Sequence, residues 1–209
     1  MEDIKKTIAR ELLQIKAIKL SPANPFIWAS GWKSPIYCDN RKILSYPETR
    51  NIVKKAFAEK VKEIYGTPDV IAGVATGAIA HGVLIAEMLN IPFVYIRSSS
   101  KAHGLANQIE GELKPKQKVV VIEDLVSTGG SSLKAVEALR NADADVLGML
   151  AIFSYGFDIA TENFKKANCR LDTLTDYYTL IDIAVERNYI LSEEMKTLQV
   201  WRKNPAEWK

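Results

Sequence analysis

Four short runs of Val, Ile and other apolar residues, separated by helical stretches, constrain this chain more than any other feature. The runs cover residues 70–74, 93–96, 119–122 and 146–153. Each is almost continuously apolar, which is typical of strands covered on both faces. Helical spacing between them predicts helices over 78–89 and 132–142. Strands and helices alternating in this way predict right-handed crossovers and an α/β fold with a mostly parallel sheet.

The remaining parts of the chain follow other patterns. Residues 4–17 and 47–65 keep apolar positions at helical spacing, and each stretch predicts one helix. Residues 21–46 are rich in Pro, Gly and aromatic residues, which predicts short strands and turns. Trp201 and Trp208 are expected to dock the last helix. With 209 residues and neither a repeat nor a linker, the chain is expected to form one domain over 1–209.

Composition and charge exclude several classes of protein. The net charge is +3, and basic residues never run longer than a pair, which argues against a nucleic-acid partner. The longest uncharged stretch, residues 70–86, is shorter than the roughly 20 apolar residues that a bilayer requires, so no membrane partner is expected. Cys38 and Cys169 lie in no metal or redox motif, and the N-terminus carries no apolar leader. We therefore expect free thiols and a cytoplasmic protein.

Residues 119–132, with the sequence VVVIEDLVSTGGSS, carry the clearest chemical signal. An apolar strand ends in two adjacent carboxylates, Glu123 and Asp124, and a loop of small and hydroxyl residues leads to a helix from about residue 133. Gly129 and Gly130 permit a sharp turn and a close approach to a ligand. The amides at the helix start, with the Ser and Thr hydroxyls, form an anion cradle. Carboxylates beside such a cradle suit ribose hydroxyls, so the segment predicts a ribose-5-phosphate site.

A simpler interpretation is a helix cap that follows a strand with surface carboxylates. The segment also lacks the lysine of a Walker A loop and the spacing of a dinucleotide-binding fingerprint. The continuous block of apolar strand, paired acids and Ser-Thr-Gly-Gly favours the ribose-phosphate site over the plain cap.

Residues 121–132 resemble the phosphoribosyl diphosphate (PRPP) signature of the type I phosphoribosyltransferases. Three further segments, 28–41, 73–77 and 97–104, resemble the substrate segment, diphosphate loop and catalytic loop of the orotate-specific branch. The resemblance implies the type I phosphoribosyltransferase fold: a mostly parallel central sheet flanked by helices, a small N-terminal hood over about 20–46 and a mobile catalytic loop. It also implies transfer of the 5-phosphoribosyl group from PRPP to N1 of orotate, giving orotidine 5′-monophosphate and diphosphate in UMP biosynthesis.

The resemblance also implies which residues bind the two substrates. Ser127 and Lys33 are the residues that the resemblance implies contact orotate. PRPP contacts are carried to a larger set from three loops: Thr76, Gly77, Arg97, Lys101, His103, Glu123, Asp124, Leu125, Val126, Ser127, Thr128, Gly129, Gly130 and Ser131. Residues 73–77 could also be a plain strand-to-helix turn, and His81 just beyond them is expected to pack rather than to catalyse.

The catalytic roles fall in the hydrophilic segment 97–112, whose composition suits a lid over the site. Lys101, His103 and Arg97 are expected to neutralise the departing diphosphate, with Lys101 in the main role. Mg²⁺ is expected to be held mainly by the diphosphate itself, with a contact to Asp124 through water as an option. In this family the lid enters the neighbouring subunit's site, which implies a homodimer with shared sites. On composition alone, the segment could be a solvated loop.

Two rival functions share part of this pattern. A purine phosphoribosyltransferase would have the ribose-phosphate loop but lack a segment like 30–41. A non-enzymatic regulator could keep a PRPP-sensing fold, but such proteins usually add a DNA-binding module. No helix-turn-helix pattern or basic patch is evident in the sequence, and Lys101 and His103 favour catalysis.

Overall fold

The computed structural model describes residues 3–28, 31–97 and 108–208. Its centre is a six-stranded sheet with the strand order β10-β9-β8-β5-β6-β7. Five strands are parallel, and only the two-residue β7 runs antiparallel, beside β6. The strands are β5 (Val70–Val74), β6 (Phe93–Ile96), β7 (Ile109–Glu110), β8 (Lys118–Val126), β9 (Asp145–Ser154) and β10 (Leu171–Asp176). The expected mostly parallel α/β sheet is confirmed.

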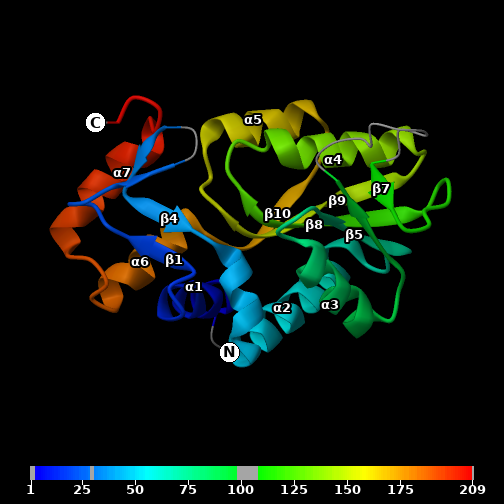
Figure 1. Ribbon diagram of the computed structural model, residues 1–209, viewed down its shortest axis with the longest axis horizontal. Helices are drawn as coiled ribbons and strands as arrows, with labels where there is room; N and C mark the ends of the chain where they lie inside the picture. Colours follow the sequence, from blue (N-terminus) through cyan, green and yellow to red (C-terminus); the bar gives the residue numbers. More distant parts are fainter. Residues whose placement is uncertain (1–2, 29–30, 98–107, 209) are drawn as a thin grey trace.

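The strand order reverses between β5 and β8. From β5 the chain passes through α3 (Ile79–Leu89) to β6, then returns to β8 on the other side of β5. It continues outward through α4 (Gly130–Asn141) to β9 and through α5 (Asp158–Lys166) to β10. Figure 1 shows α4 and α5 on one face of the sheet, with α3 and α2 (Pro47–Tyr65) on the other. Ligands bind in the crevice beyond the carboxyl ends of strands at such a reversal.

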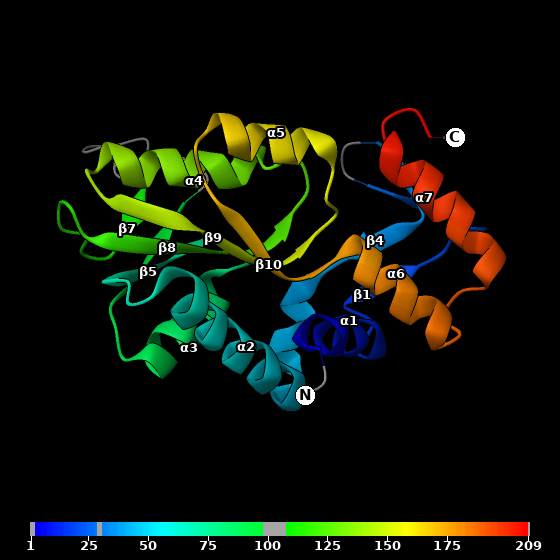
Figure 2. The ribbon, with the colours of Figure 1, turned by 180° about the vertical axis from the view of Figure 1, so that it is seen from behind.

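The two ends of the chain together form a second group of elements beside the sheet (Figure 2). Two small antiparallel pairs, β1–β4 and β2–β3, belong to the N-terminal hood. The elements are α1 (Ile4–Gln14), β1 (Ile18–Leu20), β2 (Phe26–Ile27), β3 (Lys33–Ser34), β4 (Ile36–Cys38), η1 (Asn40–Ser45), α6 (Tyr177–Glu186), η2 (Ser192–Glu194) and α7 (Met195–Lys203). One apolar cluster, from Ile8 to Trp201, joins this group to one face of the sheet.

Several predicted boundaries shift in the structure. Strands 70–74 and 93–96 and helix 47–65 have the predicted bounds, but β8 continues to Val126, so the paired carboxylates lie inside the strand. The first helix ends at Gln14 rather than residue 17, because Lys16 takes a left-handed backbone conformation with φ 55°. The helix after the loop begins at Gly130. Four of the six residues in the β10 sequence LDTLTD are polar, as an edge strand allows, and it carried no signal that predicted a strand.

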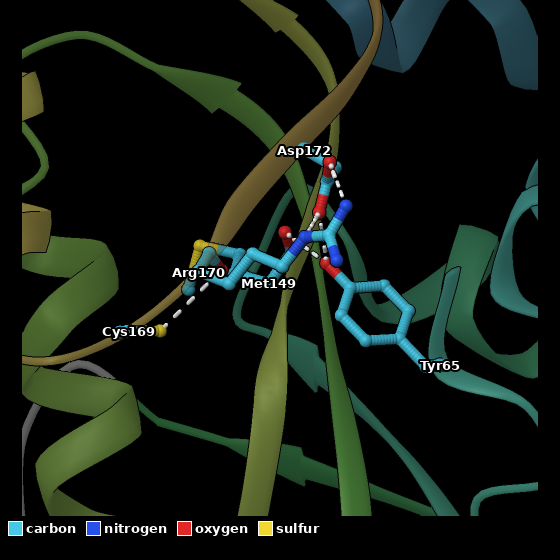
Figure 3. A network of polar contacts seen from close by, with 5 residues as sticks. All are labelled: Tyr65, Met149, Cys169, Arg170 and Asp172. Carbon is cyan, nitrogen blue, oxygen red and sulfur yellow. Dashed lines mark hydrogen bonds and ion pairs between the residues drawn. The ribbon is translucent and has the colours of Figure 1, made fainter.

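A polar network closes the far end of the sheet (Figure 3). The Tyr65 hydroxyl, at the end of α2, lies 2.8 Å from Asp172 Oδ2 and 3.0 Å from the Met149 carbonyl oxygen. Arg170 holds the same carboxylate through Nε at 2.7 Å. Asp172 lies early in β10 and Met149 near the middle of β9, both away from the carboxyl ends of their strands. This network therefore anchors α2 to the sheet and lies away from the ligand crevice.

The expected free thiols are confirmed, since Cys38 and Cys169 form no disulfide. Among the residues that the structure describes, no helix combines the length and the apolarity that crossing a bilayer requires.

Candidate active site

Glu123 and Asp124 lie near the carboxyl end of β8 and share one electrostatic environment. Glu123 is buried and accepts hydrogen bonds from Ser132 Oγ at 2.8 Å and from the Asp124 amide at 3.0 Å. Burial, and next the charge of Asp124, raise the pKa of Glu123 above its usual value. Burial likewise raises the pKa of Asp124. Two carboxyl groups this close together suit hydrogen bonds from neutral hydroxyl groups and disfavour a bound anion.

The loop after β5 approaches this pair closely. A Cβ atom at Gly77 would collide with the Asp124 carboxylate, so any larger residue there would have to displace that side chain. Thr76, the residue before it, is exposed at the same crevice. The loops from β5 and β8 thus meet at the point where the strand order reverses.

Three adjoining cavities open along this edge of the sheet. The central one, of about 420 Å³, is bounded by both loops and by the hood: Cys38, Asp39, Arg41, Val74, Ala75, Thr76, Gly77, Glu123, Asp124, Leu125 and Ser131. A second cavity of about 370 Å³ shares Cys38 and Leu125 with it. A third, of about 200 Å³, shares Val74, Ala75 and Ser131 and adds the cations Arg97 and Lys134. The second cavity is therefore apolar, the central one acidic and the third basic, and they lie in that order.

The second cavity is largely aromatic. It is lined by Ile27, Trp28, Tyr37, Cys38, Leu125, Ser127 and Tyr155. The Trp28 and Tyr155 rings lie 5.3 Å apart between centroids, and Tyr155 stacks on Phe157 at 5.3 Å and 16°. A flat heterocycle suits such walls because aromatic faces bury large areas at low entropic cost. Ser127 adds a hydroxyl at the β8 side.

Asn40 connects the hood to the carboxylate strand. β5 pairs with β8 only as far as Gly73 opposite Ile122, so the last residues of β8 lose their strand partner on that side. The buried Asn40 side chain donates to the Asp124 carbonyl at 2.6 Å, and Cys38 Sγ donates to Asn40 Oδ1 at 3.3 Å. Asn40 thereby supplies a hydrogen bond that the sheet no longer offers.

His81 is buried behind this contact and has no place in the cavities. Burial lowers the pKa of His81 to about 4, despite a hydrogen bond with the Asn40 main chain. The ring is therefore neutral near pH 7. Its position agrees with the expectation that His81 packs rather than catalyses.

Arg97 marks the start of the predicted lid. Its amide donates to the Gln108 carbonyl at 2.8 Å, and its guanidinium lies 3.3 Å from Glu110 of β7. The two ends of segment 98–107 are thus held together at the end of β6. Lys101 and His103 lie outside the described residues, so their roles stay predictions.

The structure brings most of the predicted site residues to this crevice. Those lining a cavity are Thr76, Gly77, Arg97, Glu123, Asp124, Leu125, Ser127 and Ser131. Thr128 and Gly129 form the turn into α4, where Asn163 Nδ2 donates to the Thr128 carbonyl at 3.0 Å and a Cβ at Gly129 would meet the Phe164 ring. Val126 is buried in the apolar cluster under α4. Lys33 is exposed on β3 and lines none of the three cavities.

Sequence reasoning missed Tyr155 as a lining residue, gave Trp28 no individual role within the segment 28–41 that resembles the substrate segment, and left Tyr37 open between packing and binding. Tyr155 follows β9 at its carboxyl end, so the rule that ligands bind at strand ends would have found it. Asn40 and Ser132 gave no such signal, since their partners Asp124 and Glu123 are reached only through the fold.

Comparison with known proteins agrees with this geometry. Residues 39–185 match the family described as phosphoribosyl transferase domain. The orotate phosphoribosyltransferase of Phocaeicola vulgatus is 60% identical over 208 residues, covering 100% of this chain and 98% of that protein. That of Porphyromonas gingivalis is 57% identical, covering 100% and 99%. The chain belongs to the orotate phosphoribosyltransferase family.

The fold of the orotate phosphoribosyltransferase family is also seen directly in a solved structure. The crystal structure of orotate phosphoribosyltransferase from Aeropyrum pernix superposes with a TM-score of 0.76 at 26% identity, covering 88% of this chain and 99% of that one. The predicted type I phosphoribosyltransferase fold is confirmed. Family membership over the full chain also decides against the purine-specific and the regulatory alternatives.

Proposed function

We propose that the chain transfers the 5-phosphoribosyl group of PRPP to N1 of orotate, forming orotidine 5′-monophosphate and diphosphate for pyrimidine synthesis. As a member of its family, the chain is a phosphoribosyltransferase. The observation that carries the substrate assignment is the contact between an aromatic cavity and a carboxylate cavity, which share Cys38 and Leu125. A base in the first and a ribose in the second would bring N1 next to C1′.

The residues divide the work between binding and charge stabilisation. Glu123 and Asp124 accept hydrogen bonds from the ribose hydroxyls, and the turn 127–131 with the start of α4 takes the 5-phosphate. Trp28, Tyr37 and Tyr155 line the cavity that takes the orotate ring, while Ser127 meets its carboxylate and Lys33, exposed on β3 outside the cavity lining, would reach it as a cation from the hood. As the C1′–O bond breaks, the sugar takes on oxocarbenium character and negative charge gathers on the diphosphate. Arg97, Lys101 and His103 stabilise that charge.

The proposal also includes Mg²⁺, which would bind together with the diphosphate. Within residues 3–28, 31–97 and 108–208, no three His, Cys, Asp or Glu side chains are grouped so that they could hold a metal ion. The carboxylate oxygens of Asp124 and Asp39 in the central cavity are hard donors that fit Mg²⁺ through water. When bound, the ion would neutralise the leaving group.

The proposal includes a homodimer in which each lid closes over the partner's site, and a cytoplasmic location. Support for the lid comes from the paired ends of segment 98–107 at β6 and β7. Support for the location comes from the two free thiols, which are usual in a reducing compartment.

The direct test is an absorbance assay that follows orotate loss in the presence of PRPP and Mg²⁺. We expect turnover with orotate and none with adenine, guanine or hypoxanthine. Turnover with a purine base, or none with orotate, would overturn the assignment.

A further inference from the structure

The β2–β3 pair forms one wall of the aromatic cavity but has little structure of its own. Each strand has two residues, and within the part of the chain that the structure describes the pair joins no other strand. Ile27 and Trp28, on the first strand and just after it, line the cavity, and Lys33 lies on the second. An isolated two-stranded pair is marginal in water, so its position must be set by contacts with the rest of the protein.

Besides the Phe26–Tyr37 ring contact and the hydrogen bond from Trp28 Nε1 to the Ile36 carbonyl at 3.1 Å, Trp201 of α7 supplies such a contact from the other end of the chain. It is fully buried, and its indole Nε1 donates to the Lys33 carbonyl at 3.2 Å. Its ring meets Trp28 edge-on at 5.7 Å and Tyr155 at 5.7 Å. One side chain therefore touches the strand that carries Lys33 and backs two of the aromatic residues that line the cavity.

The rest of α7 is fixed independently of the hood. The Tyr177 hydroxyl of α6 donates to the Leu198 carbonyl at 2.9 Å, and Arg202 donates to the Gly156 carbonyl and lies over the Tyr178 ring at 4.8 Å. These contacts hold α7 against α6 and the turn after β9. The Trp201–Lys33 hydrogen bond can thus be removed without releasing the helix.

We propose that Trp201 is a positioning residue for the nucleobase, acting through the β2–β3 pair and Trp28. Its hydrogen bond to Lys33 and its ring contacts fix the β2–β3 pair and Trp28 against Tyr155, so that the aromatic wall facing the orotate ring has one set position. This inference rests on the proposed function, because it takes the aromatic cavity to be the orotate site. It gives the C-terminal helix a part in substrate recognition, although α7 lines none of the three cavities.

The test is W201F, which keeps an aromatic ring and removes the N–H donor. We expect the KM for orotate to rise roughly three- to ten-fold, with the KM for PRPP and kcat within about two-fold of wild type. The matched control is Tyr177→Phe, which removes a buried side-chain donor to the backbone of the same helix and should leave the KM for orotate unchanged. Thermal unfolding is measured for both variants.

Three results would overturn the inference: an unchanged KM for orotate in W201F, an equal rise for both substrates, or the same rise in Y177F. If W201F does not fold, Trp201→Tyr takes its place, since it too lacks the indole N–H that faces Lys33, and the same split between the two KM values is expected. Failure of the proposed function is distinguishable, because the wild-type protein would then show no orotate turnover at all.

Discussion

The positions of Glu123 and Asp124 lower the stability of the fold. Two adjacent carboxyl groups are largely buried, and the pKa of each is raised by that burial. Ser132 and the Asp124 amide satisfy only part of the hydrogen-bonding capacity of Glu123. Such an arrangement is retained where a ligand completes it, because buried charge without a partner destabilises a fold.

The first prediction concerns stability against pH in Glu123→Gln. A carboxyl group whose folded pKa is raised above its unfolded value contributes stability below the unfolded value and loses it as pH rises through the folded pKa. Wild type therefore loses stability above about pH 4.5, the ordinary value for Glu, and the glutamine variant is spared that loss. We expect the Tm of E123Q to exceed that of wild type by about 2–6 °C at about pH 9, and by less at about pH 5. Equal differences at both pH values by calorimetry would contradict the raised pKa.

The second prediction concerns Asp124→Asn, which removes the charge of the second ribose acceptor while keeping its shape. The Kd for PRPP should rise about ten- to a hundred-fold by titration calorimetry, as expected for hydrogen bonds to a charged group. Asp172→Asn is the control, since Asp172 is a carboxylate of the same sheet at its opposite end. An unchanged Kd in D124N would remove Asp124 from the ribose site.

At the scale of elements, the chemistry collects where β5 and β8 end, and the sequence already indicated much of this. The apolar strand, the two acids and the Ser-Thr-Gly-Gly turn predicted the phosphate-and-ribose loop, since their spacing is local. The aromatic cavity was not predicted, because Trp28 and Tyr155 are 127 positions apart (155 − 28) and meet only through the fold. For the same reason the Asn40–Asp124 contact, which spans 84 positions, left no local pattern.

The third prediction concerns the lid. Lys101→Ala should lower kcat by about 100- to 1,000-fold, because a cation that stabilises charge only in the transition state is lost. The Kd for PRPP should change little. Lys114→Ala is the control, as Lys114 is an exposed lysine just beyond β7. Unchanged turnover in K101A would show that the lid assignment is wrong.

At the scale of the whole molecule, we infer a single domain, because α1, α2, α6, α7 and one face of the sheet share one apolar cluster. Elements from both ends of the chain form or pack against the walls of the site. The hood forms one wall of the aromatic cavity, and α7 packs against that hood. Removal of α7 would therefore weaken substrate binding as well as lower the stability of the fold.

The fourth prediction tests the shared sites of the proposed dimer. At a PRPP concentration well below its Kd for D124N, K101A and D124N are each expected to be nearly inactive alone. If a lid closes over the partner's carboxylates, half of the dimers in an equal, re-equilibrated mixture are hybrids, and each hybrid has one intact site of two. The mixture should then recover about one quarter of wild-type activity. No recovery, despite exchange of subunits shown by mass spectrometry, would place each lid over its own subunit's site.

A crystal structure with orotate and a non-reacting PRPP analogue tests the ribose assignment most directly. We predict ribose hydroxyls within hydrogen-bonding distance of the Glu123 and Asp124 carboxylates, the 5-phosphate at the start of α4, and the orotate ring in the cavity that Trp28, Tyr37 and Tyr155 line. A ribose bound elsewhere, with both carboxylates free of it, would contradict this assignment.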